Sequence, residues 1–332
     1  MAAYPSHPKE DKPVTGYVAV VGENVADAIV QPSETPSGPM QWQIFPGGSP
    51  ANTAVALGRL GTPTRFLSRL PCGILGGLFA RRLNDSSVDL SLSTWSDEPA
   101  TLAITSVENS VAHYEFYANG TVDWQWRPGE LHPARLQGAS CIHAGSLGLI
   151  MEPGGRIVEE LLESIREHAT VSIDPNVRTT LVSSEHYRSR LKEWYRLADI
   201  FRISEDDLTH LAPGSTPERI IGELIETGIQ LVIVTRGEAG VLASFRGALI
   251  DVPAVRTEVV DTIGAGDAFS AGLLHWLHQN GHLGGRLECL DQQGARSALV
   301  FASHVAALTC AAPGADPPWN RHLTPAVRNL LR

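Results

Sequence analysis

Short apolar runs alternate with amphipathic segments along most of this chain, and this alternation restricts the possible fold more than any other feature. The runs are rich in Val and Ile and lie at Tyr17–Val21, Ser140–His143, Val171–Ile173, Ile200–Ile203 and Leu231–Val234. Continuous apolar runs suit strands that are buried on both faces. Helical periodicity marks the segments between and after them: Ala51–Leu60, Leu78–Leu83, Arg156–His168, His186–Leu197, Pro217–Thr227, Ala268–Gln279 and Gln292–Thr309. The pattern predicts βαβ units and therefore an α/β fold with a mostly parallel sheet between helices.

Two separated stretches depart from this rhythm. Within Met40–Phe45, apolar and polar side chains alternate, which is typical of a strand with one solvated face. Thr101–Val107 and Val111–Tyr117 flank a short polar segment and predict a β-hairpin. Together they indicate a small, partly exposed sheet attached to the α/β body.

The sequence therefore predicts three kinds of region. An α/β body is formed by residues 14–27, 46–96 and 127–330, and a small β-sheet lid by residues 28–45 and 97–126. Residues 1–13 form a disordered leader. A small sheet joined to a larger body suits a lid over a binding site; the alternative is a β insertion that never moves.

Composition excludes several classes of protein. The 332 residues are 43% hydrophobic and 19% charged, and the net charge is -10, which makes nucleic acid an improbable partner. No apolar stretch is long enough to span a bilayer. The four cysteines are widely spaced, so we expect reduced thiols in a cytoplasmic protein without a disulfide framework.

The segment Asp261–Asp267 is the strongest local indication of chemistry. It reads Asp-Thr-Ile-Gly-Ala-Gly-Asp and directly precedes an apolar helix. A glycine-rich turn that begins a helix presents unpaired amides at the positive end of the helix dipole, which is a site for an anion. Asp267 in the same turn adds a proton acceptor, so the segment suits phosphoryl transfer to a hydroxyl. Alternatively, Asp267 merely caps its helix.

A second segment, Pro46–Ala54, has a double glycine before a helix whose first turn carries Asn52. Glycines let a ligand approach the backbone closely, and the Asn amide offers a donor and an acceptor to a polyol. The alternative is an ordinary strand–turn–helix with small residues for tight packing.

The two segments together resemble the signatures of the PfkB (ribokinase-like) carbohydrate kinases, and the resemblance extends from about Val14 to Pro318. It implies a ribokinase-like three-layer α/β/α sandwich with a mostly parallel central sheet and a small β-sheet lid. It also implies an enzyme, an ATP:sugar phosphotransferase, that uses Mg²⁺ and transfers the γ-phosphate of ATP to a sugar hydroxyl. K⁺ is left open as a further activator.

Carried over by position, the resemblance makes Asp267 the general base and the amides of Gly264, Ala265 and Gly266 the anion hole. Residues 22–27 match the fructokinase-like branch, which implies that Asp27 binds sugar hydroxyls together with Gly48 and Asn52. Residues 174–178 also resemble that branch and place Arg178 near the phosphates. Two alternatives stay open, namely that Arg178 only pairs with a surface acid and that Asp27 is an exposed loop acid.

On the nucleotide side, the resemblance implies contacts from Thr235, Gly237 and Gly240, although these residues could instead form a tight hairpin. Some positions depart from the family pattern. The family's metal-associated Asn-x-x-Glu is replaced by Ser204 and Asp207, and its usual adenine-side Asn by Ser303. Asp207 can still hold Mg²⁺ through water, because magnesium needs few direct protein ligands; Asp261 is a second, indirect metal candidate.

Charge bears on the acceptor. Residues 23–58 and 97–126 contain no Lys or Arg but eight acids: Glu23, Asp27, Glu34, Asp97, Glu98, Glu108, Glu115 and Asp123. A sugar acid or sugar phosphate is normally met by a guanidinium or ammonium, so a neutral sugar is favoured. Tyr114 and Phe116 share a face of their strand and are candidates to pack on a sugar ring; the alternative is that they pack within the core of the lid.

We therefore expect a kinase for a neutral sugar, with fructose favoured. The alternatives are a 2-keto-3-deoxygluconate kinase, a ribokinase or a nucleoside kinase of the same family, or a non-catalytic sugar- or nucleotide-binding regulator. The small sheet also offers a surface through which a homodimer could form.

Overall fold

The computed structural model describes residues 15–31, 39, 41–108 and 111–331, so the leader expected at 1–13 lies outside the described residues. A nine-stranded sheet in the order β15-β14-β13-β12-β11-β10-β1-β4-β6 forms the body. Its strands are β1 (Tyr17–Val21), β4 (Thr64–Leu67), β6 (Val88–Asp89), β10 (Ala139–Gly145), β11 (Thr170–Asp174), β12 (Ile200–Ser204), β13 (Leu231–Thr235), β14 (Val241–Phe245) and β15 (Ala248–Val252). All neighbours from β6 to β13 are parallel, whereas β14 and β15 pair antiparallel, so the expected mostly parallel sheet is confirmed.

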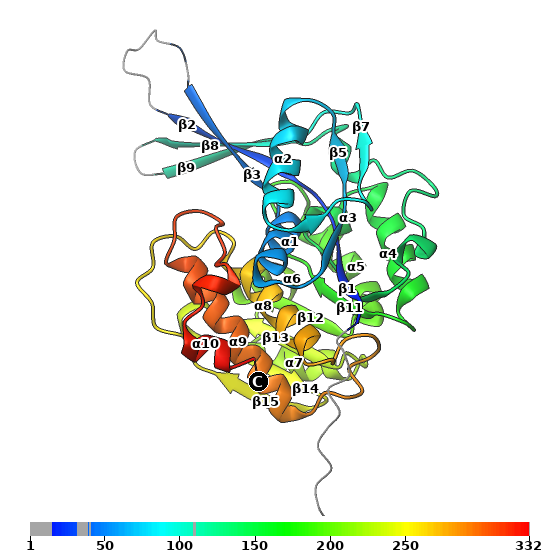
Figure 1. The fold of residues 1–332 in the computed structure, drawn as a ribbon, viewed down its shortest axis with the longest axis vertical. Helices are drawn as coiled ribbons and strands as arrows, with labels where there is room; N and C mark the ends of the chain where they lie inside the picture. Colours follow the sequence, from blue (N-terminus) through cyan, green and yellow to red (C-terminus); the bar gives the residue numbers. More distant parts are fainter. Residues whose placement is uncertain (1–14, 32–38, 40, 109–110, 332) are drawn as a thin grey trace, which may run out of the picture.

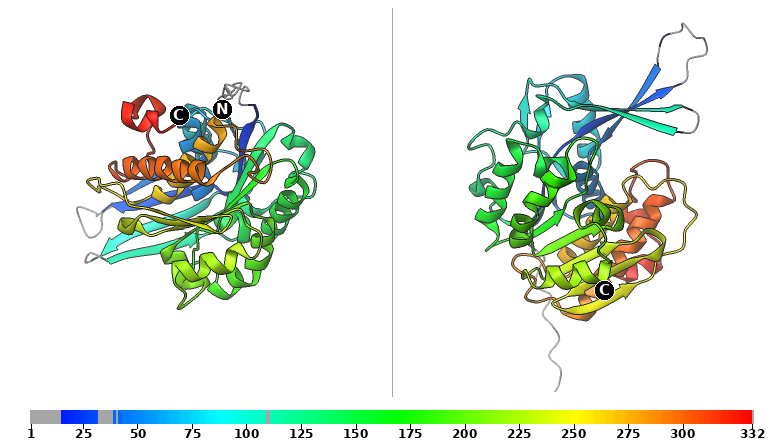
Figure 2. Two further views of the ribbon diagram at one scale, coloured as in Figure 1. Left: turned by 90° about the horizontal axis from the view of Figure 1, so that it is seen from below. Right: turned by 180° about the vertical axis from the view of Figure 1, so that it is seen from behind.

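Helices cover both faces of this sheet (Figure 2). One layer contains α1 (Ser49–Leu60), α2 (Ile74–Asp85), α8 (Ala265–Gln279), α9 (Gln292–Cys310) and α10 (Pro325–Asn329). The other contains α3 (Ser146–Ile150), α4 (Gly154–Ile165), α5 (Ser184–Leu197), α6 (Glu205–Leu211) and α7 (Pro217–Ile225). Successive strand residues feed opposite cores: Val18 and Val20 join the first, and Ala19 and Val21 join the second. This alternation explains why the central strands are apolar throughout.

A separate four-stranded sheet projects from the body (Figure 1) and is made from two distant chain segments, as expected. Its order is β3-β2-β8-β9, with β2 (Val25–Gln31), β3 (Gln41–Gly47), β8 (Thr101–Glu108) and β9 (Val111–Tyr117). The strands differ from the anticipated boundaries. Pairing starts at Val25 and ends at Gly47, and residues 118–126 return to the body, because Trp124 and Trp126 are buried in the main core.

The expectation of one solvated face on β3 is wrong. Both faces are exposed along most of the strand: Trp42 is 44% accessible and Phe45, which points the other way, is 48% accessible. The reason is that the small sheet stands away from the body and packs on it only near its base, where Ala26 meets Leu70 and Phe79.

The base of the small sheet is held by the buried carboxylate of Asp123, which lies in the 3₁₀ helix η1 (Val122–Trp124). Asp123 accepts hydrogen bonds from the backbone amide of Asn24 at 3.0 Å and from the Thr101 hydroxyl at 2.6 Å. Burial raises the pKa of Asp123 to about 6, and these hydrogen bonds oppose that rise. One side chain therefore joins both segments of the small sheet where they leave the body.

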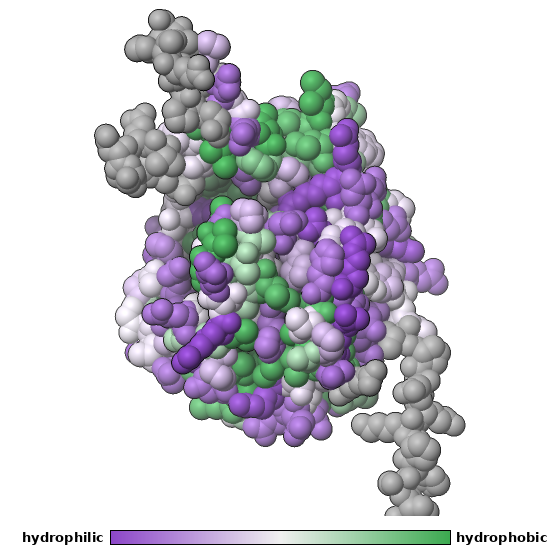
Figure 3. Space-filling model, turned by 60° about the vertical axis from the view of Figure 1, so that its left-hand side comes forward, coloured by the Kyte–Doolittle hydropathy of each residue, from purple (hydrophilic) through white to green (hydrophobic). Residues whose placement is uncertain are grey.

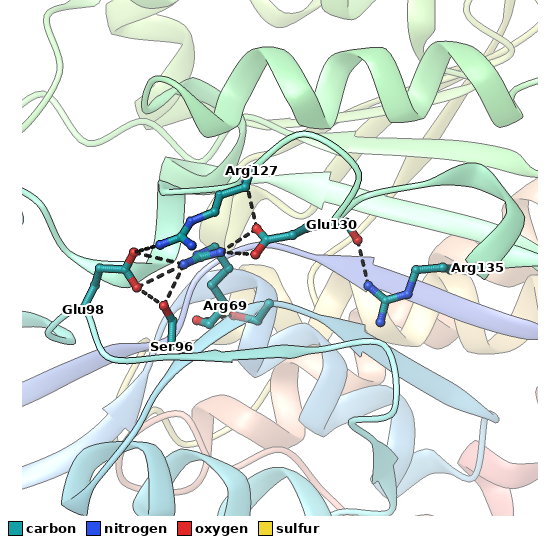
Figure 4. A network of polar contacts seen from close by, with 7 residues as sticks. Arg69, Ser96, Glu98, Arg127, Glu130 and Arg135 are labelled. Atoms are coloured by element: carbon teal, nitrogen blue, oxygen red, sulfur yellow. Dashed lines mark hydrogen bonds and ion pairs between the residues drawn. The ribbon is translucent and has the colours of Figure 1, made fainter.

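An ion-pair network fastens the second of these segments at both of its ends (Figure 4). Arg69, on β5 (Arg69–Pro71), is buried and donates to Glu98 at 3.0 Å and to Glu130 at 2.5 Å. Glu98 precedes β8, and Glu130 follows the return of the chain to the body. Arg127 adds a contact to Glu98 at 3.1 Å.

The remaining short elements complete the body. They are β7 (Thr94–Ser96), which pairs with β5, and the 3₁₀ helices η2 (Pro133–Leu136), η3 (Gly237–Ala239) and η4 (Asn320–His322). Within the described residues, no helix has the length and apolar character that crossing a bilayer requires.

Candidate active site

Asp267 lies in the first turn of α8, buried, and both of its carboxylate oxygens are held by α1. The Ser49 hydroxyl donates to Oδ1 at 2.6 Å and the Asn52 amide donates to Oδ2 at 2.8 Å. The N-cap of α8 is Gly264, so Asp267 does not cap its own helix. Burial raises the pKa of Asp267, and the hydrogen bonds from Ser49 and Asn52 offset part of that rise. Each oxygen keeps a lone pair for a further donor, so the carboxylate is available to a hydroxyl.

The turn before Asp267 has the backbone that an anion site needs. Gly264 has a φ of +76°, and a Cβ placed there would lie 2.7 Å from that of Ala315, so only glycine fits. The Ala265 amide donates to the Thr262 carbonyl at 3.2 Å. Helix geometry leaves the amides of Gly266 and Asp267 without intrahelical partners. The expected three-amide hole is thus partly used within the turn.

Arg202 lies directly beside this turn. A Cβ on Gly266 would come within 2.9 Å of the Arg202 guanidinium, so a glycine allows the close approach. Arg202 donates to Asp174 at 2.9 Å and to the Thr235 hydroxyl at 2.6 Å. The ends of β11, β12 and β13 therefore meet beneath the turn Gly264–Gly266, called the anion turn below. This is the edge at which open α/β sheets place their ligands.

The predicted acceptor side comprises β2, β3 and the start of α1. Gly48 has a φ of +100°, and its missing side chain leaves room for the Glu23 carbonyl, 2.6 Å from where a Cβ would lie. A Cβ placed on Gly47 would lie 1.9 Å from Asp27 Oδ2, so the Asp27 side chain lies against the double glycine. Burial raises the pKa of Asp27 to about 6, although Arg82 and Arg178 lower it. The structure therefore brings together Asp27, Gly48 and Asn52, the three residues that the resemblance suggests as sugar ligands.

Arg178 follows β11 and is exposed, with its amide donating to the Tyr187 hydroxyl at 3.2 Å. Its charge lowers the pKa of both Asp27 and Asp267, which places the guanidinium within electrostatic reach of both carboxylates. Among the described residues, Arg178 makes no ion pair of its own. Pairing with a surface acid, the alternative considered for it, is not observed.

Ser204 and Asp207 form a capping box at the start of α6. The Ser204 hydroxyl lies 2.6 Å from Asp207 Oδ2, and the Asp207 amide donates back to that hydroxyl at 3.0 Å. Asp207 Oδ1 accepts from the Val177 amide at 2.9 Å. Asp261 is similarly engaged, because it accepts from the amides of Ile263 at 3.0 Å and Gly314 at 2.8 Å. Both metal candidates, Asp207 and Asp261, thus already accept hydrogen bonds from backbone amides.

The remaining predicted nucleotide residues lie on β13, on the connection from β13 to β14, and on α9. Thr235 ends β13, and Gly237 and Gly240 form the tight connection to antiparallel β14, so the hairpin alternative describes the backbone correctly. Gly240 packs against β15, with a Cβ position 2.2 Å from the Val252 carbonyl. Ser303 is buried on α9 and donates to the Leu299 carbonyl at 2.9 Å.

Tyr114 and Phe116 lie on β9 opposite Thr105 and Ala103. Phe116 is half-buried, and the side chain of Tyr114 lies outside the described residues. By register, Ala103 stands beside Asp27, so Phe116 projects from the same face of the small sheet as Asp27. Figure 3 shows apolar side chains on the small sheet and on the body beneath it.

Sequence reasoning missed three residues of this site. Ser49 lies inside the segment Pro46–Ala54, directly after the double glycine, so its position could have been recognised from the sequence. Arg202 interrupts an otherwise apolar strand, and a charge in a buried strand implies a partner and is thus a usable signal. Arg82 carries no sequence signal; it approaches the acceptor side from α2, so the absence of bases in residues 23–58 and 97–126 does not make the folded site free of cations.

The chain is similar to several known proteins. The family model "pfkB family carbohydrate kinase" matches residues 15–321. The fructokinase of Rhizobium leguminosarum bv. trifolii is 31% identical over 278 residues, which cover 83% of this chain and 84% of that protein. Fructokinase-1 of Oryza sativa subsp. japonica is 32% identical over 281 residues, which cover 82% of this chain and 84% of that protein. The crystal structure of a fructokinase with bound ATP from Xylella fastidiosa superposes with a TM-score of 0.84 at 27% identity, covering 95% of this chain and 98% of that one.

Proposed function

Because the chain belongs to the pfkB family of carbohydrate kinases, we propose that it transfers the γ-phosphoryl group of ATP to a primary hydroxyl of fructose, with Asp267 as the general base. One observation carries the assignment of the base. The Asp267 carboxylate is buried at the start of α8, beside the anion turn, and is held by Ser49 and Asn52 from the acceptor side. It therefore lies where a hydroxyl and a phosphoryl group would meet.

In this proposal Asp267 accepts the proton of the primary hydroxyl as that oxygen attacks the γ-phosphorus in line and the bond to the leaving ADP oxygen breaks. The hydrogen bonds from Ser49 and Asn52 fix the carboxylate, so no reorganisation is needed during the step. The amides of Gly266 and Asp267, with the positive end of the α8 dipole, stabilise the charge on the phosphoryl oxygens. Arg178 adds positive charge on the same side.

A neutral acceptor is supported by the way the nearby cation is used. Arg82 donates three of its five N–H groups to Pro46, Asn52 and Ala315, so most of its hydrogen-bonding capacity is used within the protein. Asp27 and Asn52 offer hydrogen-bonding groups to hydroxyls, and Phe116 offers an apolar surface. We propose that the small sheet acts as the lid over this acceptor.

The proposal includes Mg²⁺ and leaves K⁺ as a further activator. Mg²⁺ supplies charge neutralisation on the phosphates and needs few direct protein ligands. Asp207 would hold it through water, since its oxygens already accept hydrogen bonds from Val177 and Ser204. The loop at Asp261, tied to Gly314, is the proposed place for K⁺.

The test is turnover of an acceptor panel by the purified protein with ATP and Mg²⁺, followed by ADP formation. Fructose, ribose, 2-keto-3-deoxygluconate and adenosine separate the proposed function from the alternatives, and fructose should give the highest kcat/KM. A clear preference for the sugar acid would overturn the neutral-sugar proposal. If no acceptor is turned over, a non-catalytic regulator becomes the better account.

We also propose a homodimer through the small sheet. Trp42 and Ile44 project from the face opposite to Asp27 and are exposed, at 44% and 39%, so a second copy would cover an apolar strip. Trp42→Glu should convert a dimer to a monomer in light scattering. Leu249→Glu, at an exposed apolar position of β15 on the body, is the matched control and should leave the mass unchanged. A wild-type monomer would contradict this proposal.

A further inference from the structure

Arg82, in the last turn of α2, makes contacts with three segments that border the acceptor side. Nη1 donates to the Pro46 carbonyl at the end of β3 and to Asn52 Oδ1 on α1, the latter at 3.0 Å. Nη2 donates to the Ala315 carbonyl at 2.6 Å. One guanidinium thus connects β3, α1 and the segment that follows α9.

The contact to Asn52 determines which way its amide points. An Asn side chain has one acceptor oxygen and one donor nitrogen. Because Oδ1 accepts from Arg82, Nδ2 is directed to Asp267, to which it donates at 2.8 Å. Arg82 and Asp267 therefore define a single orientation of Asn52, and removal of Arg82 leaves the buried oxygen without this partner.

The other two contacts connect the acceptor side to the anion turn. Pro46 precedes Gly47, which lies against Asp27. Ala315 lies against Gly264, 2.7 Å from where a Cβ would stand. A displacement of either segment is therefore transmitted to the groups that flank the reacting atoms.

Several charged groups face Arg82 and its partners. Burial and Arg59 lower the pKa of Arg82, while Asp316, Asp267 and Asp27 raise it. Arg178 faces both Asp27 and Asp267, and Asp174 faces Asp267. Loss of the Arg82 charge should therefore raise the pKa of Asp27, since Arg82 is the larger of the two cationic influences on it.

From these contacts we infer that Arg82 is a positioning residue of the kinase site, which orients Asn52 toward Asp267 and ties the lid strand β3 to the segment beside the anion turn. The inference rests on the proposed function. Arg82 acts through Asn52, Pro46 and Ala315, and it does not itself contact the reacting atoms.

The experiment compares Arg82→Ala, Arg82→Lys and Arg81→Ala, the last being an exposed neighbour on the same helix that serves as the control. Arg82→Ala should raise the KM for fructose about tenfold or more, because a charge-assisted hydrogen bond to Asn52 is lost. The acidic limb of its kcat/KM profile should move to higher pH, because Arg82 interacts electrostatically with Asp267 as well as with Asp27 and its loss should raise the pKa of both. Arg82→Lys keeps the charge but not the fork of donors, so its limb should stay near that of the wild type while the KM remains raised.

A second readout needs no turnover. Hydrogen exchange in Arg82→Ala, or in Arg82→Lys if the alanine variant does not fold, should be faster than in Arg81→Ala within residues 41–52 and 311–318. Exchange equal to that of Arg81→Ala, or an unchanged fructose KM and pH profile in Arg82→Ala, would overturn the inference. If wild-type protein phosphorylates no sugar, the proposed function fails, and the exchange result alone decides the role of Arg82.

Discussion

Two helices, α6 and α8, carry an acid at the third position of the first turn, and the two acids differ in what holds them. Asp207 of α6 pairs with Ser204 in a capping box through Oδ2 and accepts from the Val177 amide through Oδ1, so its carboxylate is used within the structure. Asp267 of α8 follows a glycine cap and is held by Ser49 and Asn52 from another helix.

The difference teaches that the residue at the cap decides what such an acid is available for. In the capping box, the serine hydroxyl contacts the carboxylate and accepts from the amide of the third helical residue. A glycine cap in the left-handed region leaves both the amides and the carboxylate to external partners. The α8 terminus is therefore open to the anion and the proton that we propose for it, whereas both oxygens of Asp207 already have partners.

The largest effect on this contrast is expected from Gly264→Ser, which gives α8 the cap of α6. A side chain at a φ of +76° costs roughly 1–3 kcal/mol of unfolding free energy, and overlap with Ala315 should displace the anion turn and lower kcat as well. Denaturant unfolding and steady-state kinetics measure the two effects.

Gly214→Ser is the matched control, because Gly214 has a φ of +78° and no neighbour within 4 Å. It should share the conformational cost and keep the wild-type kcat. Equal kcat values for the two variants would show that the Gly264 turn has no special role.

A smaller effect is expected from Ser49→Ala on the pH dependence. The proposed base role requires ionised Asp267, whose pKa is raised by burial, so kcat/KM should be full above that pKa and fall about tenfold per pH unit below it. Ser49 lowers this pKa, so its removal should move the acidic limb to higher pH. If the acidic limb of Ser49→Ala stays at the wild-type pH, Asp267 is not the group whose ionisation the limb reports.

The smallest effect is expected from Ser204→Ala. Loss of the cap should reduce the unfolding free energy by about 1 kcal/mol, with kcat at saturating ATP and Mg²⁺ within a few-fold of wild type. Ser183→Ala, at the remote N-cap of α5, should cost a similar amount of stability. A loss of kcat far beyond that of Ser183→Ala would assign Ser204 a role in the reaction and weaken the comparison.

The sequence predicted those features whose cause is local. Hydrophobic periodicity located the central strands β1, β10, β11, β12 and β13 and most of the long helices, but not the outer strands β4, β6 and β15. Glycine spacing located the turn before Asp267. The lid was predicted from two period-two segments because such alternation does not fit a doubly covered sheet. Its exposure on both faces was missed, since a strand pattern does not report how far a sheet stands from the body.

What could not be predicted depends on long-range approach. Arg82 reaches Asn52 only because α2 packs beside α1, and no spacing in the chain encodes this contact. The capping box of Asp207, in contrast, was predictable from the sequence, because Ser204 lies three residues before it. The resemblance to a metal-associated motif predicted a ligand role for these two residues instead.

The most direct test of the central claim compares Asp267→Asn with Asp207→Asn over a titration of Mg²⁺. We expect Asp267→Asn to lose about 10²–10⁴ in kcat at every Mg²⁺ concentration, because a general base is removed, while its unfolding free energy stays close to wild type. Asp207→Asn should need more Mg²⁺ and recover to within several-fold of the wild-type kcat at saturation. A kcat for Asp267→Asn within a few-fold of wild type would contradict the account.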